Sequence, residues 1–125
     1  MTDKVMVLGT EYSIAVSKYT EEMFERSNGD RLSGYCDRTM RHIAICDMTT
    51  FPGWENETIE SCRISERQTL RHEIVHAFLN ESGLHDNTHN TENGWARNEE
   101  MVDWFANQGP KIYKAWEEAG ALDKR

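Results

Sequence analysis

The order of strand-like and helix-like segments along the 125 residues predicts an α+β fold, with its strands in the first half and its helices in the second. Short apolar runs of strand length, separated by turn residues, occupy the chain up to residue 46. A longer segment with helix-start and helix-stop signals follows residue 64. The length is that of one ordinary domain and no internal repeat or linker divides it, so we expect a single domain over residues 1–125.

A small antiparallel or mixed β-sheet is expected at the N-terminus. Residues 4–8 and 11–16 are β-rich runs that Gly9 separates. Residues 20–26 are acidic, and we expect them to form one or two helical turns before the turn Asn28-Gly29-Asp30.

A β-hairpin is expected next. Residues 32–36 and 41–46 flank Asp37-Arg38-Thr39-Met40, which fits a four-residue loop between two strands. In the second arm two isoleucines alternate with His42 and Ala44, so one face of this arm is expected to pack on the core and the other face is not.

A central helix is expected between a capping box and a glycine stop. Residues 47–62 are polar and contain Pro52-Gly53, so they are interpreted as an irregular excursion. Ser65 followed by Gln68 forms the capping box. Gly83 followed by leucine suits a Schellman-type end.

Two C-terminal helices are expected after a loop over residues 84–95. The first begins near Arg97 and ends at Gly109-Pro110, because proline does not continue a helix readily. The second covers residues 111–119. The expected architecture is therefore a small sheet followed by a central helix and C-terminal helices.

The charge and the hydropathy exclude several classes of partner. Fourteen Lys and Arg against 22 Asp and Glu give a formal charge of −8, which disfavours binding to nucleic acid. No apolar run approaches the roughly 18 residues of a membrane span, and the N-terminal apolar stretch is too short for a signal peptide. We therefore expect a cytoplasmic protein with neither nucleic acid nor a membrane as its partner.

The three cysteines, Cys36, Cys46 and Cys62, are odd in number and match no paired CxxC zinc signature. Three reduced thiols are the ordinary state in a cytosolic protein. A disulfide between Cys46 and Cys62 is the alternative, and nothing in the sequence selects it.

The central helix contains His72-Glu73-Ile74-Val75-His76, which has the HExxH spacing. Residues four apart on a helix share one face, so the imidazoles of His72 and His76 can converge on one metal ion. Glu73 lies about 100° around the helix, where its carboxylate can reach a metal-bound water without taking a ligand position. This arrangement predicts metal-assisted hydrolysis with a zinc ion, which lowers the pKa of bound water toward roughly 7.

The rest of this helix indicates that the site is buried. Apolar residues cover most of the helical wheel, and the remaining polar sector consists of His72, Glu73, His76 and Asn80. Buried polar side chains need partners, and a metal ion supplies them. The alternative is two core histidines that other groups satisfy, beside an incidental glutamate. Arg71 and Glu81 fit the wheel poorly and are expected to reach solvent along their stems.

A third ligand is expected, because catalytic zinc usually has three protein ligands and a water. The longer pattern HExxHxxGxxH is excluded, since Leu79 and Ser82 stand where it requires glycine and histidine. His85 and His89, just beyond the helix, are candidate ligands.

A better candidate lies in residues 98–103. Glu99 and Asp103 are one turn apart on one face of the next helix. Glu99 is expected to bind the metal, and Asp103 is expected to accept the free N–H of a ligating imidazole. Glu100, about 100° away on the helix, is the second choice of ligand.

The segment HEIVHAFLNESGL followed by NEEMVDWFA resembles the gluzincin pattern, in which a glutamate on a later helix completes HExxH and an aspartate follows one turn on. More narrowly, the chain is similar to the small bacterial and phage metallopeptidases of the ImmA/IrrE type. Their second motif has asparagine where this chain has Asp103. The resemblance covers about residues 68–106. It implies a zincin-like fold, one Zn²⁺ ion and a peptide or protein substrate.

The fold class of these enzymes also implies that an extended substrate pairs with the strand before the active-site helix. The residues expected to form this edge strand are Arg41, His42, Ile43, Ala44 and Ile45; an ordinary sheet edge is the alternative. Peptide hydrolysis needs a donor for the developing oxyanion. Three candidates remain open, namely Tyr35, His85 and His89.

The sequence therefore predicts a cytoplasmic zinc metallopeptidase, a hydrolase in which His72, His76 and Glu99 hold the metal. Glu73 is the expected general base, and Asp103 is expected to orient a ligating imidazole. The alternative is a non-catalytic zinc-containing accessory or phage protein that retains the HExxH site.

Overall fold

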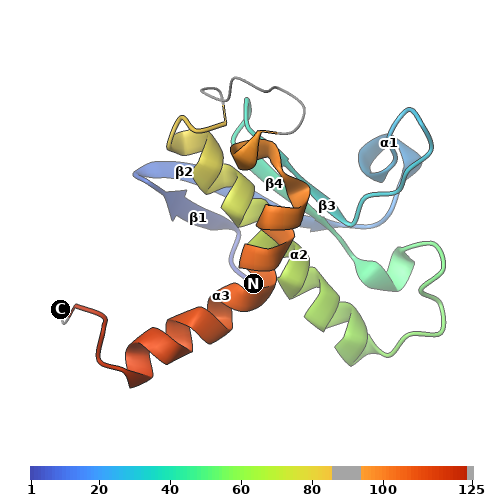
Figure 1. Ribbon diagram of the computed structural model, residues 1–125. Helices are drawn as coiled ribbons and strands as arrows, with labels where there is room; N and C mark the ends of the chain where they lie inside the picture. Colours follow the sequence, from blue (N-terminus) through green and yellow to red (C-terminus); the bar gives the residue numbers. More distant parts are fainter. Residues whose placement is uncertain (86–93, 124–125) are drawn as a thin grey trace.

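Four strands and three α-helices make up the described part of the chain, residues 1–85 and 94–123, in a computed structural model (Figure 1). The first half contains β1 (Lys4–Val7), β2 (Thr10–Ser17), α1 (Glu21–Phe24), β3 (Gly34–Asp37) and β4 (His42–Cys46). The second half contains the 3-10 turn η1 (Met48–Thr50), α2 (Ile59–Glu81), the 3-10 turn η2 (Trp95–Arg97) and α3 (Glu99–Glu118). The α+β prediction is confirmed. None of the described helices is long and apolar enough to cross a membrane.

The strands form one mixed sheet in the order β1-β2-β4-β3. β1 and β2 are antiparallel, as are β3 and β4, so both hairpin-like pairs follow from their short connections. β2 and β4 are parallel, because α1 and β3 lie in the crossover between them. The mixed sheet expected from the sequence is therefore present.

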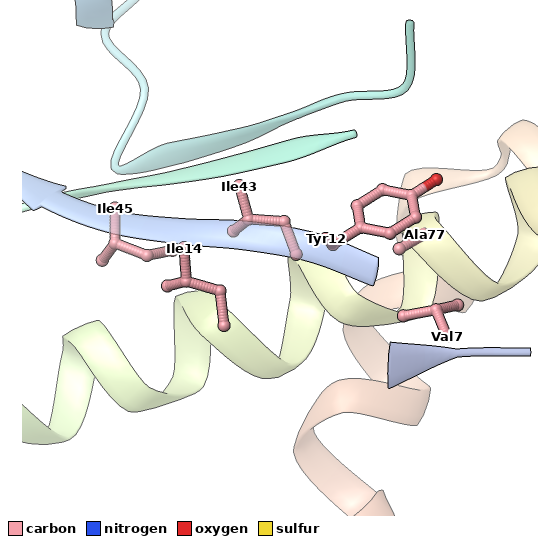
Figure 2. Close-up of a cluster of buried hydrophobic side chains, with 6 residues drawn as sticks. All are labelled: Val7, Tyr12, Ile14, Ile43, Ile45 and Ala77. Carbon is pink, nitrogen blue, oxygen red and sulfur yellow. The ribbon is translucent and has the colours of Figure 1, made fainter. Parts of the chain in front are cut away.

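Helix α2 packs across one face of this sheet, as Figure 1 shows. The core at this interface joins apolar side chains of three strands to Ala77 of α2 (Figure 2). Its buried members are Val7, Tyr12, Ile14, Ile43, Ile45 and Ala77. This packing determines which face of α2 is turned away from the sheet. The histidines of α2 lie beside that face.

β4 is buried on both faces, which corrects the expected division of its residues into a core face and an outer face. Ile43 and Ile45 pack toward α2, whereas Ala44 and Cys46 enter a second buried cluster with Phe24. A strand with neighbours on both edges and covered on both sides is the most sheltered position in a sheet. All three cysteines of the chain are free thiols.

Helix α2 begins at Ile59, six residues before the expected capping box. The hydroxyl oxygen of Thr58 accepts the N–H of Ser61 at 3.0 Å and caps the helix there. The added turns are held by Glu66, which is buried and accepts the backbone N–H of Met48 at 2.9 Å. The sequence prediction was wrong because Ser65 lies inside a helix whose first turns are fixed by tertiary contacts with η1.

The end of α2 lies where the glycine stop predicted it. Gly83 has φ +82° and donates its N–H to the carbonyl of Asn80 at 3.1 Å. The expected loop over residues 84–95 extends into positions 86–93, which lie outside the described residues.

Helix α3 runs without a break from Glu99 to Glu118, which corrects the expected end at Gly109-Pro110 and merges the two expected C-terminal helices into one. Pro110 has no N–H to give to the carbonyl of Ala106, one turn earlier. The Nε atom of Arg71 donates to that carbonyl at 3.0 Å and replaces the missing helical hydrogen bond. The local cost of the proline is therefore reduced by a contact from α2.

Arg71 and Glu81 do not reach freely into solvent as expected. Arg71 is half-buried against α3. The carboxylate of Glu81 is 8% exposed, and it accepts the hydroxyl of Tyr12 at 3.1 Å and the Nε of Arg41 at 3.2 Å. Both polar side chains are stabilised at poor wheel positions by partners on other elements.

The edge strand β3 approaches α2 very closely at Gly34. A Cβ atom at this position would lie 2.7 Å from Cγ2 of Thr69 and 2.8 Å from the carbonyl oxygen of Ala44. The hydroxyls of Ser33 and Thr69 are also 3.2 Å apart. Glycine is therefore needed here to hold β3 beside the middle of α2, and this contact places the edge of the sheet next to the histidines.

Candidate metal centre

Helix α2 brings the side chains of His72, Glu73 and His76 together. The Nε2 atoms of the two histidines lie 3.2 Å apart, as one turn of helix predicts. One possible ligand atom from each of the three residues lies within 4.8 Å of the others, so this group could hold a metal ion. The two imidazoles are largely buried, and Glu73 is buried.

Helix α3 brings a fourth side chain, Glu99, to the same point. Its Oε2 atom is 3.0 Å from Nε2 of His72, and its Oε1 atom is 3.0 Å from Nε2 of His76. Glu99 is the first residue of α3, and the side chain of Asn98 caps the helix by accepting the N–H of Met101 at 2.9 Å. Its position is thus set by where α3 starts.

Asp103 lies one turn further along α3 and contacts the other side of the same imidazole. Its Oδ1 atom is 2.6 Å from Nδ1 of His72. With its carboxylate ionised, this oxygen accepts the Nδ1–H of His72 and leaves the lone pair of Nε2 facing Glu99 and His76. The structure therefore brings together five residues that the sequence prediction named, namely His72, Glu73, His76, Glu99 and Asp103.

The three atoms closest to one another match the donor set of a tetrahedral metal site. They are Nε2 of His72, Nε2 of His76 and Oε2 of Glu99, separated by 3.0–3.3 Å. Ligands bound at 2.0–2.1 Å in a tetrahedron lie about 3.3 Å apart. Glu73 is farther away, with its Oε2 atom 3.9 Å from Nε2 of His72. Glu99 thus completes the triangle, and Glu73 lies beside it.

The alternative ligands fit less well. Glu100 is exposed, and no hydrogen bond or ion pair joins its side chain to the described residues. His85 lies beyond the end of α2, where its Nδ1 atom contacts the guanidinium of Arg38. The prediction for His89 lies outside the described residues.

The electrostatics of the centre favour a cation. Burial lowers the pKa of His72, but the hydrogen bond with Glu99 and the charges of Glu73, Glu99 and Asp103 outweigh burial and raise that pKa to about 9. Hydrogen bonds from His72 and His76 hold the pKa of Glu99 far below its usual range. A site that retains a proton so strongly also attracts a metal ion, which competes for the same lone pair.

The carboxyl of Glu73 has a different environment from that of Glu99. Burial raises its pKa, and the two histidines oppose this effect. A carboxyl with a raised pKa and no fixed ligand position is suited to taking up and giving back a proton.

The centre opens into a cleft of about 560 Å³ between β3, α2 and α3. Tyr35 and His85, two of the candidate oxyanion donors, line this cleft, and His89 lies outside the described residues. The thiol of Cys36 also lines it; burial raises its pKa to about 12, and the nearby charge of Glu73 adds to the shift, so the thiol is neutral.

The strand at the edge of this cleft is β3, which corrects the expectation that the edge strand contains Arg41, His42, Ile43, Ala44 and Ile45. β4 lies between β2 and β3, so its main chain is already paired on both sides. Arg41 lies before β4, with φ +52°. Sequence order was misleading because β4, although it is the last strand before α2 along the chain, lies inside the sheet, whereas the preceding strand β3 lies at its edge.

Sequence reasoning missed Arg71, the link between α2 and the Pro110 gap in α3. The available signal was its polar side chain at a poor wheel position, next to His72.

Comparisons of the chain with protein-family descriptions, with curated proteins and with solved structures give no significant match. The chemistry of the centre is therefore inferred from its own geometry.

Proposed function

We propose that this chain is a zinc-dependent peptidase with a zincin-like arrangement of its sheet and active-site helix. In this proposal His72, His76 and Glu99 hold one Zn²⁺ ion. The observation that supports it most strongly is the triangle of two imidazole nitrogens and one carboxylate oxygen at 3.0–3.3 Å, with the carboxyl of Glu73 next to it.

Zinc is the metal that suits this donor set best. Two neutral imidazoles and one carboxylate are a common protein contribution to a catalytic zinc site, which keeps a position open for water or substrate. When bound, zinc lowers the pKa of its water and polarises the carbonyl of the scissile bond. A purely structural zinc site is usually closed by four protein ligands, and it has no use for the neighbouring carboxyl of Glu73.

The side chains of the chain supply the remaining chemistry. Glu73 takes a proton from the attacking water and delivers it to the leaving amine. Asp103 holds His72 in the tautomer that presents Nε2 to the metal. Tyr35 or His85, which line the cleft, donates to the developing oxyanion.

The main chain of β3 binds the substrate in this proposal. Ser33 accepts the N–H of Cys46, and backbone groups of successive residues alternate in direction along a strand, so the N–H and C=O groups of Gly34 and Cys36 point away from β4. No described strand pairs with this outer edge. An extended peptide can add to it through main-chain hydrogen bonds that do not depend on sequence.

The substitution Glu73→Gln tests the proposal. It removes the proton acceptor and keeps the size of the side chain, so we expect hydrolysis of unfolded protein substrates to fall by at least a factor of about 100. Zinc, measured by elemental analysis, is expected to remain at one ion per chain. The control is Glu100→Gln, which should keep both activity and zinc.

Turnover by Glu73→Gln at the wild-type rate would contradict the role of Glu73. A wild-type protein that holds one zinc ion but cleaves no substrate from a broad panel, with and without a chelator, would point instead to a non-catalytic zinc protein.

A further inference from the structure

The charged side chains that line the cleft are divided by position. Among the described residues, the carboxylates in the lining belong to the metal centre: Glu73, Glu99 and Asp103. The lining also contains three arginines: Arg26, Arg31 and Arg38. Outside the metal centre these lining residues therefore carry positive charge, whereas in the chain as a whole 22 acidic residues outnumber 14 basic ones.

The arginines lie toward the two ends of the cleft. β3 runs beside α2, because Ser33 contacts Thr69, one turn before Glu73. Arg31 comes two residues before Ser33 along the chain, and Arg38 comes after the last residue of β3. At about 3.3 Å per residue of extended chain, the backbones of Arg31 and Arg38 are on the order of 20 Å apart. A peptide of about six extended residues spans that distance.

The end near α1 carries accessible positive charge. Arg26 is exposed and makes no hydrogen bond or ion pair with other described side chains. Arg31 is exposed, and its guanidinium contacts the hydroxyl of Tyr19. These two guanidinium groups can bind carboxylates through paired N–H donors.

The formal charge of −8 does not prevent an acidic ligand from binding here. At physiological ionic strength, interactions between exposed charges are screened beyond about 8 Å. A ligand in the cleft is therefore affected mainly by the arginines close to it, and its uncharged middle meets the metal centre. A carboxylate next to the metal centre would itself bind the zinc ion at its open position, so the acidic groups must lie away from the scissile bond.

We propose that the cleft selects extended peptides that are uncharged around the scissile bond and carry Asp or Glu toward the end formed by Arg26 and Arg31. This substrate class rests on the proposed function, because it takes the metal centre to be the place of cleavage. The arginine end formed by Arg26 and Arg31 determines the preference for acidic over uncharged peptides.

The test compares two fluorescent eight-residue peptides that differ only in having Glu or Gln at the outer positions. Binding is measured by anisotropy on the zinc-loaded Glu73→Gln protein, so that no peptide is cleaved. We expect the Glu peptide to bind about tenfold more tightly at 0.15 M salt, and we expect the difference to shrink at 0.5 M salt. In the background Arg26→Gln/Arg31→Gln the preference should fall below about threefold.

A matched control removes the same charge elsewhere. Arg67 and Lys111 are exposed and do not line the cleft, so Arg67→Gln/Lys111→Gln should keep the full preference. Equal binding of the two peptides, no binding of either, or an equal loss of preference in both double variants would overturn the inference. Circular dichroism and unfolding temperatures confirm that each variant is folded.

The proposed function is measured separately. The wild-type protein is tested for cleavage of the same two peptides with and without a chelator. Failure to cleave, with the binding preference intact, contradicts the peptidase and leaves an acidic-peptide site. Cleavage of both peptides with equal kcat/KM supports the peptidase and overturns the substrate class.

Discussion

His72 has two ring nitrogens with different partners, and this difference organises the whole centre. Nδ1 lies 2.6 Å from Asp103, and Nε2 lies 3.0 Å from Glu99. Because α3 supplies both carboxylates one turn apart, a small rotation of that helix would move both partners together. The site is therefore sensitive to single residues of α3 as well as to the histidines of α2.

Separate substitutions of Glu99 and Glu100 test which of these two neighbouring glutamates binds the metal. We expect Glu99→Ala to lower zinc affinity by a factor of about 100 or more, since it removes the carboxylate whose two oxygens each lie 3.0 Å from one of the imidazoles. Glu100→Ala should change affinity less than threefold, because Glu100 is exposed and no hydrogen bond or ion pair joins its side chain to the described residues. Competition with a chromogenic chelator measures both constants, and the opposite order would move the third ligand by one residue.

At the scale of elements, one side chain of α2 compensates for a proline in α3. Arg71 donates to the carbonyl of Ala106, which Pro110 leaves without its helical partner. The local sequence Gly109-Pro110 predicts a helix end, because proline leaves that carbonyl without its helical N–H partner. The continuous helix thus results from packing against α2, and the periodicity of the sequence does not predict this packing.

A double-mutant cycle tests this compensation. Arg71→Ala leaves the carbonyl of Ala106 unpaired and should cost about 1–3 kcal/mol in the free energy of unfolding. In the background Pro110→Ala a new N–H can bond the same carbonyl, so Arg71→Ala should cost at least about 1 kcal/mol less there. Urea unfolding measures the four proteins, with the exposed Arg67→Ala as the control. Equal costs in both backgrounds would show that Arg71 does not compensate for the proline.

For the whole molecule, the candidate centre joins α2, which is fixed to the sheet, with α3, which contacts α2. The second half of α3 extends away from the sheet (Figure 1). A metal bound by His72, His76 and Glu99 would therefore link the two helices and stabilise the folded chain in proportion to its affinity.

The stabilisation by zinc should depend on pH with a defined sign. The pKa of His72 in the metal-free fold is raised from 6.5 to about 9, so its proton-linked stability is complete below pH 6.5 and is lost as the pH rises through about 9. Zinc needs His72 without its proton, so its apparent affinity should rise about tenfold per pH unit in this window.

Thermal unfolding in a zinc buffer checks this expectation. The rise in melting temperature caused by zinc should be larger at pH 8.0 than at pH 6.5. No rise is expected when Mg²⁺ replaces zinc, or when zinc is added to the variant His72→Ala. A shift that is equal at both pH values would contradict the competition between proton and metal at His72.

The sequence by itself determined the local features of this protein. The strands, the hairpin, the glycine stop after α2 and the common face of His72 and His76 follow from periods of two and 3.6 residues and from the conformational freedom of glycine. The spacing of Glu99 and Asp103 likewise places both carboxylates on one helix face.

Only the tertiary structure decided which elements meet. It placed β4 inside the sheet and β3 at the cleft, started α2 at Ile59 through Glu66, and carried α3 past Pro110 through Arg71. Each of these outcomes depends on a partner far away in the sequence that satisfies a buried polar group or covers an apolar face. Local patterns reveal that such a group needs a partner, but the packing of the whole chain determines which one it receives.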